Sequence, residues 1–165
     1  MNIKFIFGLL AAITLFTAQL ALVAALPGGH YFYVSLVVLV FIMVLGGLET
    51  AAWWFLLNGF LLDLFAFKFF GFYTLLFAVI LTAVYLLFNN VLTNRSLYAF
   101  LLLVAVAVLF YDLASYLVLG LSWQNFFIME LKRLGANLLL TIVIFYAITL
   151  LSYRLRPVFL IRTKN

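Results

Sequence analysis

Long apolar runs make up most of the chain, and short groups of turn-forming or charged residues separate them. The runs are continuous, whereas the strands of a membrane β-barrel would alternate apolar and polar residues over about ten positions. A helix that crosses a bilayer needs about 20 mainly apolar residues. The pattern therefore predicts an all-α integral membrane protein with six transmembrane helices in one bundle. The predicted spans are 5–26, 31–45, 51–67, 69–88, 97–119 and 134–151.

The breaks between the runs contain residues that favour turns, such as Pro27, Gly28 and Gly29. The second and third runs are short, and the break at Lys68 rests on one charge that a lipid-facing helix can also tolerate by snorkelling. The first run has small residues before Pro27, as a signal peptide does, but it is long enough to cross a bilayer. We therefore expect a retained first helix and a single domain over residues 1–165.

The composition supports a membrane protein and excludes most site chemistries. The chain is 70% hydrophobic and 8% charged, whereas about a quarter of the residues in soluble domains are charged. It contains no Cys and one His, His30, so it has no disulfide framework and too few ligands for a Cys or His metal cluster. There is no glycine-rich phosphate loop and no histidine-based triad. We expect no cofactor and no enzymatic activity.

The basic residues predict the orientation, because short cytoplasmic loops are enriched in Lys and Arg. If the N-terminus is inside, the inner segments contain Lys4, Arg95, Arg154, Arg156, Arg162 and Lys164. The outer segments then contain Lys68, Lys132 and Arg133. This distribution predicts that both termini are cytoplasmic and that the basic C-terminal tail lies on anionic lipid. Because the basic residues flank apolar runs, the net charge of +5 indicates orientation rather than nucleic-acid binding.

Two of the four acids lie within predicted spans, where a carboxylate costs roughly 3 kcal/mol. Asp63 lies near the outer end of the third span and Asp112 near the outer end of the fifth. Both should therefore sit in the outer half of the membrane, on the side that holds Lys68, Lys132 and Arg133. We expect a cluster of paired charges there, with Asp112 close to the third-to-fourth hairpin or to the outer end of the sixth span.

A second group of polar residues follows helical spacing near the sixth span. Glu130, assigned to the last outer loop, is followed by Arg133, Asn137 and Thr141 at intervals of three, four and four, which puts all four on one helix face. The sixth helix should therefore begin before Leu134, with this face toward the bundle, because unsatisfied polar groups in lipid are costly.

The other polar residues are predicted to stabilise the bundle. Asn58, Asn137 and Thr141 can hold the bundle together by interhelical hydrogen bonds, each contributing about 0.6 kcal/mol. Gln19 in the first span is expected to make such a bond, and Gly59, one turn before Asp63, would let a neighbouring helix approach closely. Whether the acids only stabilise the bundle or bind a partner is left open by the sequence.

The stretch 59–75 resembles the signature of the rod-shape-determining protein MreD family. That family has a Gly-x-x-x-Asp-Leu run and a further Gly eight residues after the Asp, and Gly59, Asp63, Leu64 and Gly71 match in register. Chain length, six spans, the basic tail and the acid in the fifth span are also similar. The chain departs from the family at Phe67, where a small residue is usual, and it lacks the frequent Pro before the second Gly.

The resemblance implies a role without catalysis. MreD-like proteins are inner-membrane scaffolds of the bacterial elongation machinery, and they act with an MreC-like protein, an MreB-like actin, a RodA-type glycosyltransferase and a class B penicillin-binding protein. Their fold is similar to the S component of energy-coupling-factor transporters. The alternative is therefore a substrate-binding S component that takes a vitamin in an outward-facing pocket, although the chain has no strong Ala-x-x-x-Ala face for a coupling partner.

Overall fold

A computed structural model describes residues 3–25, 28–66, 69–92, 96–119 and 126–154 of the chain. Within these residues the protein is all-helical, without a β-strand. The elements are α1 (Ile3–Ala25), the short 3-10 helix η1 (Gly29–Tyr31), α2 (Val34–Gly46), α3 (Leu48–Ala66), α4 (Phe72–Asn90), α5 (Leu97–Leu119) and α6 (Phe126–Arg154).

Four segments of the described chain are long and apolar enough to cross a membrane, which indicates a membrane-embedded protein. They are Gly29–Gly46, Phe72–Asn90, Leu97–Val118 and Phe126–Leu151. The third predicted span, α3, is helical but is not one of the four, and it carries Glu49, Asn58 and Asp63. The first predicted span forms α1, which is also not one of them. Six membrane crossings therefore remain a prediction.

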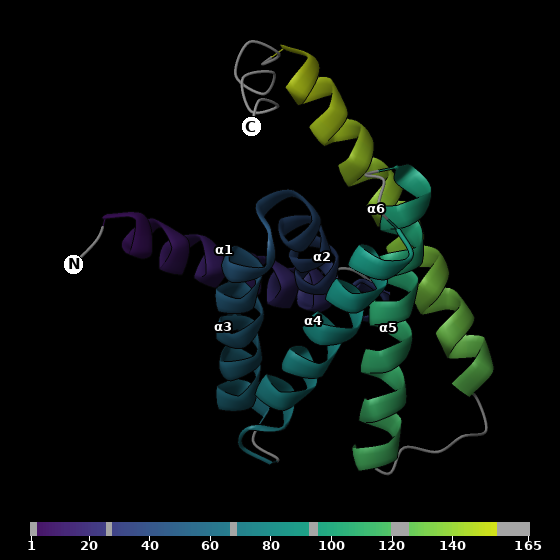
Figure 1. Cartoon of the computed structure of the whole chain (residues 1–165). Coiled ribbons are helices and arrows are strands. Elements are labelled where there is room, and N and C mark those ends of the chain that lie inside the picture. Colours follow the sequence, from purple (N-terminus) through teal and green to yellow (C-terminus); the bar gives the residue numbers. More distant parts are fainter. Residues whose placement is uncertain (1–2, 26–27, 67–68, 93–95, 120–125, 155–165) are drawn as a thin grey trace.

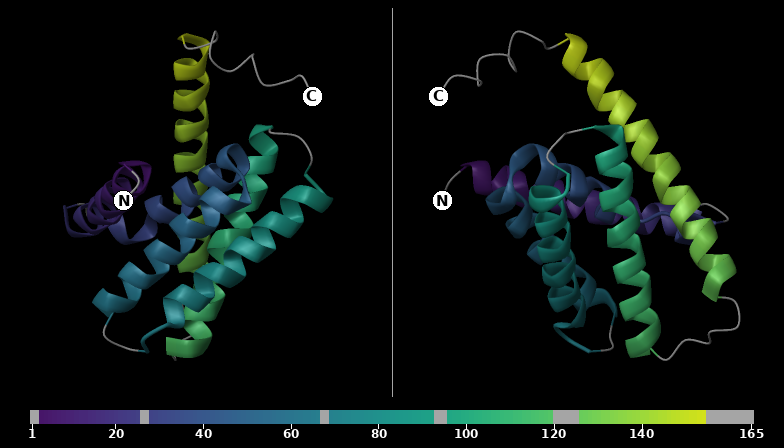
Figure 2. Two further views of the ribbon diagram at one scale, coloured as in Figure 1. Left: turned by 60° about the vertical axis from the view of Figure 1, so that its left-hand side comes forward. Right: turned by 45° about the vertical axis from the view of Figure 1, so that its right-hand side comes forward.

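The helices pack as neighbouring pairs around α2. Figure 1 shows that α3 and α5 end, and α4 and α6 begin, at the same end of the molecule, which we call the hairpin end. The two members of each pair lie against each other, and α2 contacts every other helix. In Figure 1 and in the right view of Figure 2, α1 runs across the direction of α3 and α5, and the C-terminal half of α6 extends away from the other helices.

The burial of the helices shows which of them form the core. Half of the Gly29–Gly46 segment is buried, but only 11% of the Phe126–Leu151 segment. Both are strongly apolar, so their difference in burial follows from position rather than composition. The largest fully buried side chains come from α2 to α5 and include Phe55, Phe77 and Phe100. The aromatic residues of the chain thus fill the centre as well as its surface.

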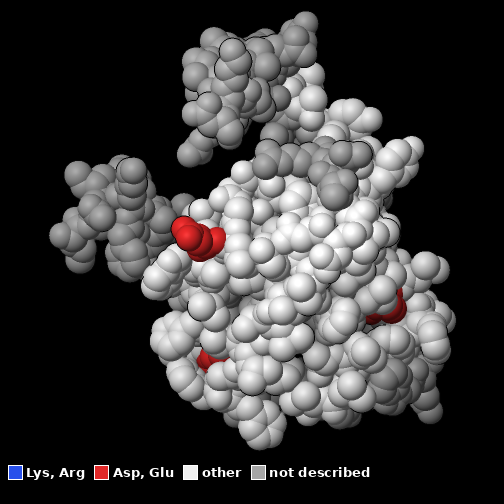
Figure 3. Space-filling model, in the orientation of Figure 1, with Lys and Arg blue, Asp and Glu red and all other residues white. Residues whose placement is uncertain are grey.

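Apolar side chains also cover the outside, as expected where lipid is the solvent. The face in Figure 3 is almost wholly uncharged, with small acidic areas and no visible Lys or Arg among the residues coloured by charge. Trp53, Tyr98 and Phe127 are among the most exposed side chains, and each lies within two turns of a helix N-terminus. This placement fits the interfacial aromatic residues of membrane proteins.

The structure corrects the predicted start of the sixth span and confirms the predicted break near Lys68. The sixth helix begins at Phe126, eight positions before the start of the predicted span, so Glu130 lies in α6 and not in a loop. The expectation that this helix begins before Leu134 is confirmed. The break near Lys68 is present, because α3 ends at Ala66 and α4 begins at Phe72. Lys68 itself, Arg95 and the tail beyond Arg154 lie outside the described residues.

Candidate functional site

The first part of the candidate site is the contact between Asp63 of α3 and the N-terminus of α4. Asp63 Oδ1 accepts a hydrogen bond from the backbone N–H of Tyr73 at 2.8 Å. Asp63 Oδ2 accepts one from the N–H of Thr74 at 2.9 Å and one from the Thr74 hydroxyl at 2.5 Å. The side chain is only 5% exposed, yet its oxygens are satisfied, because the first N–H groups of a helix have no partner within that helix.

The local backbone explains why α4 needs this contact. Gly71 is the N-cap of α4 and has φ of 93°, a left-handed conformation that favours glycine. A glycine has no side chain to cap the helix. Asp63 supplies the oxygens that a Ser or Asp at the N-cap would supply, and its negative charge is favoured at the positive end of the helix dipole. One buried carboxylate is thus stabilised without a cation among the described residues.

Gly59 sets how closely α4 can approach α3. A Cβ atom built on Gly59 would lie 2.6 Å from Thr74 Cα and 3.0 Å from both Thr74 N and Tyr73 O. All three atoms belong to the backbone of α4, so no side chain can rotate away. Only glycine allows the first turn of α4 to come within reach of Asp63. Gly59, Asp63 and Gly71 therefore act together to form one capped hairpin.

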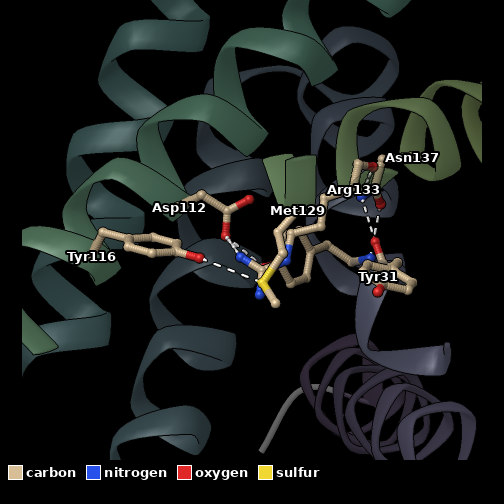
Figure 4. A network of polar contacts seen from close by, with 7 residues as sticks. Tyr31, Asp112, Tyr116, Met129, Arg133 and Asn137 are labelled. Carbon is tan, nitrogen blue, oxygen red and sulfur yellow. Dashed lines mark hydrogen bonds and ion pairs between the residues drawn. The ribbon is translucent and has the colours of Figure 1, made fainter. Parts of the chain in front are cut away.

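The second part of the site lies between α5, α6 and the segment that joins η1 to α2. Asp112 Oδ1 accepts hydrogen bonds from Arg133 Nη1 and from the Tyr33 hydroxyl, both at 2.7 Å. Figure 4 shows Asp112 and Arg133 pointing toward each other from α5 and α6. The Arg133 guanidinium also lies over the Tyr33 ring, 5.9 Å from its centroid. Asp112 is 1% exposed, so this ion pair is held away from water.

Asn137 joins α6 to the same segment through backbone groups. Its Oδ1 accepts a hydrogen bond from Tyr33 N at 2.8 Å, and its Nδ2 donates to Tyr31 O at 2.9 Å and to Arg133 O at 2.8 Å (Figure 4). The Gln19 side chain of α1 donates to Phe32 O at 2.6 Å and accepts from Ser35 N. The expected bundle bond of Gln19 is therefore present.

The predicted polar face of α6 looks into the bundle. Glu130, Asn137 and Thr141 are buried, and the Arg133 side chain is 17% exposed. Asp112 takes the second of its two expected positions, beside the N-terminal part of α6, where it forms an ion pair with Arg133. Among the described residues, Asp63 and Asp112 thus do not share one cluster of paired charges, because Asp63 binds the α4 N-terminus.

Two predicted interhelical bonds are instead made within a helix. Asn58 Nδ2 donates to Trp54 O at 2.9 Å, and Thr141 Oγ1 donates to Asn137 O at 2.7 Å. Both are bonds from a side chain to the carbonyl one turn earlier in the same helix, which need no partner helix. Besides Gln19, the residue among those expected to bridge helices that reaches another element within the described chain is Asn137.

Three tyrosines connect the two parts of the site, and sequence reasoning missed them. The Tyr33 and Tyr111 ring centroids lie 4.9 Å apart, and those of Tyr111 and Tyr73 lie 6.3 Å apart in a stacked arrangement. Tyr33 binds Asp112 through its hydroxyl and Tyr73 binds Asp63 through its backbone. Tyr111 directly precedes Asp112 in the sequence, but no local pattern signals which rings will meet across three helices.

The arrangement can hold helices together and can present a fixed surface. Within the described residues no group of three or more His, Cys, Asp or Glu side chains could hold a metal ion. Backbone N–H groups and carbonyls bind the side-chain polar atoms of Asp63 and Asn137. Comparison of the chain with protein-family models, with curated proteins and with solved structures found no match.

Proposed function

We propose that the chain is a non-catalytic scaffold of the bacterial cell-elongation machinery, similar to the MreD family. In this proposal it lies in the inner membrane with both termini in the cytoplasm. It links an MreC-like protein, an MreB-like actin, a RodA-type glycosyltransferase and a class B penicillin-binding protein, and it binds no nucleic acid. The proposal rests on the residues that resemble the family signature and on the four apolar helices of the described chain.

One observation supports the proposal most. Gly59 and Asp63 lie one turn apart on α3, and Gly71 is the N-cap of α4. These three residues, which carry the resemblance, meet in one capped hairpin. Each residue type has a structural reason. A Cβ at position 59 would clash with α4, the Asp63 carboxylate binds two N–H groups of α4, and Gly71 has a positive φ. A motif with a shared structural task is less easily produced by chance than a motif of unrelated positions. Exposed Phe69 and Phe70 at the same turn offer an apolar surface to a membrane partner.

Depletion of the protein in its host tests the proposal. A scaffold of the elongation machinery should leave rounded cells with delocalised wall synthesis after depletion. Complementation then separates the roles of Asp63: if Asp63→Asn restores rod shape and Asp63→Ala does not, a hydrogen bond in the hairpin is needed. If neither variant restores shape at normal abundance, a partner needs the carboxylate itself. Rods with normal wall synthesis after full depletion would contradict the proposal.

The second candidate is a substrate-binding S component of an energy-coupling-factor vitamin transporter. It is favoured by the buried polar residues around η1, α5 and α6, where Asp112 and Ser115 each have a buried oxygen without a partner in the described chain. Lost vitamin uptake in cells of normal shape would favour this candidate over the scaffold. Uptake and shape measured in the same depleted cells therefore decide between the two.

A further inference from the structure

Glu130 is a buried acid that the bundle leaves without a partner. It is 6% exposed, and both of its carboxylate oxygens lack a hydrogen-bond partner among the described residues. It lies on α6 one turn before Arg133, beside the Asp112–Arg133 ion pair. The Oδ2 atom of Asp112 is also buried and has no partner in the same part of the chain. Two buried carboxyl groups with unpaired oxygens thus lie beside the same arginine.

The charges around Glu130 do not balance if both acids are ionised. Asp112 from α5 and Arg133 from α6 act on it most directly. The other titratable side chains around the ion pair, among the described residues, are the uncharged phenol groups of Tyr33, Tyr111 and Tyr116. Among the described residues, two carboxylates would therefore face one guanidinium, which binds Asp112 through Nη1 and has its Nε buried without a partner.

An uncompensated carboxylate in such surroundings is very costly, and a buried acid then usually takes up a proton instead. A proton needs no cavity, whereas a metal ion would need more ligands than the described residues bring together. We infer that Glu130 and Asp112 form a proton-binding pair, in which Glu130 is protonated at neutral pH and can donate to Asp112 Oδ2.

This proton has a structural consequence that does not depend on the proposed function. With Glu130 neutral, Arg133 remains paired with Asp112, and Asp112 also holds the Tyr33 hydroxyl. Loss of the proton would add a negative charge beside that pair and weaken the contact of α6 with α5 and with the start of α2. The packing of α6, the least buried of the candidate spans, would thereby depend on pH.

The chain allows a direct test, because Glu49 and Glu130 are its only glutamates. Glu49 lies exposed in the first turn of α3, so Glu49→Gln leaves Glu130 as the only glutamate without changing its surroundings. Full-length E49Q protein, labelled with ¹³C at the glutamate carboxyl group and placed in lipid nanodiscs, is measured by infrared spectroscopy. At neutral pH we expect the carbonyl band of a protonated acid. A band of ionised carboxylate alone would overturn the inference.

Stability as a function of pH gives an independent readout. Above about pH 4 an unfolded glutamate loses its proton, while folded Glu130 keeps it, so the folded state binds one proton more. Stability must then fall as pH rises, by about tenfold in the folding equilibrium constant per pH unit until the folded protein releases the proton. Glu130→Gln should remove this dependence, and Glu49→Gln should retain it. A Glu130→Gln variant with the wild-type pH dependence would overturn the inference.

Discussion

Asp63 and Asp112 are both buried carboxylates near the hairpin end, but the protein stabilises them in different ways. Asp63 binds two backbone N–H groups and one hydroxyl at the start of α4. Asp112 binds a guanidinium and a phenol that come from two other parts of the bundle. A helix N-terminus presents only partial charge, whereas Arg133 carries a full positive charge. Removal of a partner should therefore have different consequences at the two places.

The two places also differ in sequence distance. The partners of Asp63 lie 10 and 11 residues away, so its contacts fix one hairpin. The partners of Asp112 lie 79 and 21 residues away, so its contacts fix how separate helices pack. The chain of tyrosine rings from Tyr33 through Tyr111 to Tyr73 runs between them. The hairpin is thus a local unit, and the ion pair is part of the global packing of the bundle.

The largest effect is expected from Arg133→Ala. It leaves Asp112 buried without its cation, and removal of one member of a buried pair usually costs about 3–5 kcal/mol. Lys132→Ala is the matched control, because Lys132 is exposed on the neighbouring position, where a lone charge contributes little. Unfolding of the purified proteins in lipid nanodiscs measures the difference. Equal stabilities of the two variants would show that the ion pair does not hold α6 in place.

Gly59→Ala should have the next largest effect, at the hairpin. The added methyl group would meet the α4 backbone at 2.6 Å, and overpacking of this kind costs up to about 3 kcal/mol. Gly135→Ala is the control, since a Cβ at that helical position meets nothing within 4 Å. There the substitution should be neutral or slightly stabilising, because alanine favours a helix. If the Gly59→Ala protein is as stable as the Gly135→Ala protein, the close α3–α4 contact does not require glycine at position 59.

Asp63→Ala should cost less, about 2 kcal/mol, which is the upper end for loss of a helix cap. The cost is below that of Arg133→Ala because the substitution leaves unpaired N–H groups and no uncompensated charge among the described residues. Asp63→Asn retains one oxygen acceptor and should fall between wild type and Asp63→Ala. The same unfolding measurement orders the three proteins. A cost for Asp63→Ala as large as that of Arg133→Ala would mean that a cation also pairs with Asp63.

Much of the helical layout could be predicted from the sequence, because apolar runs and turn residues are local signals. The break near Lys68 and the polar face of α6 follow from such signals alone. The start of α6 was placed too late, because the charges of Glu130, Lys132 and Arg133 look like a loop when only hydropathy is considered. Their helical spacing was the better guide.

The partners of the acids could be predicted only in part. Both acids were expected to pair with cations, and this holds for Asp112. Lys68, one of the expected partners of Asp63, lies outside the described residues. Among the described residues Asp63 binds N–H groups at the start of α4, which hydropathy and charge counts ignore. Tyr33 and Tyr111 gave no signal, since a buried aromatic ring and a lipid-facing one look alike in an apolar sequence. Which ring meets which is decided by packing.

The smallest effect is expected from Gly71→Ala, which tests the hairpin without touching its packing. A Cβ at Gly71 meets nothing within 4 Å, but the residue has φ of 93°. Alanine in the left-handed region costs about 1 kcal/mol or slightly more, so Gly71→Ala should destabilise less than Gly59→Ala. Gly71→Asn should cost less still, because asparagine adopts this conformation more readily than alanine. If the alanine variant is less stable than the asparagine variant, and both are less stable than the wild-type protein, backbone conformation determines the residue at position 71. If alanine and asparagine are equally tolerated, the turn relaxes to a negative φ, and the position of the α4 N-terminus relative to Asp63 is then set by Gly59 alone.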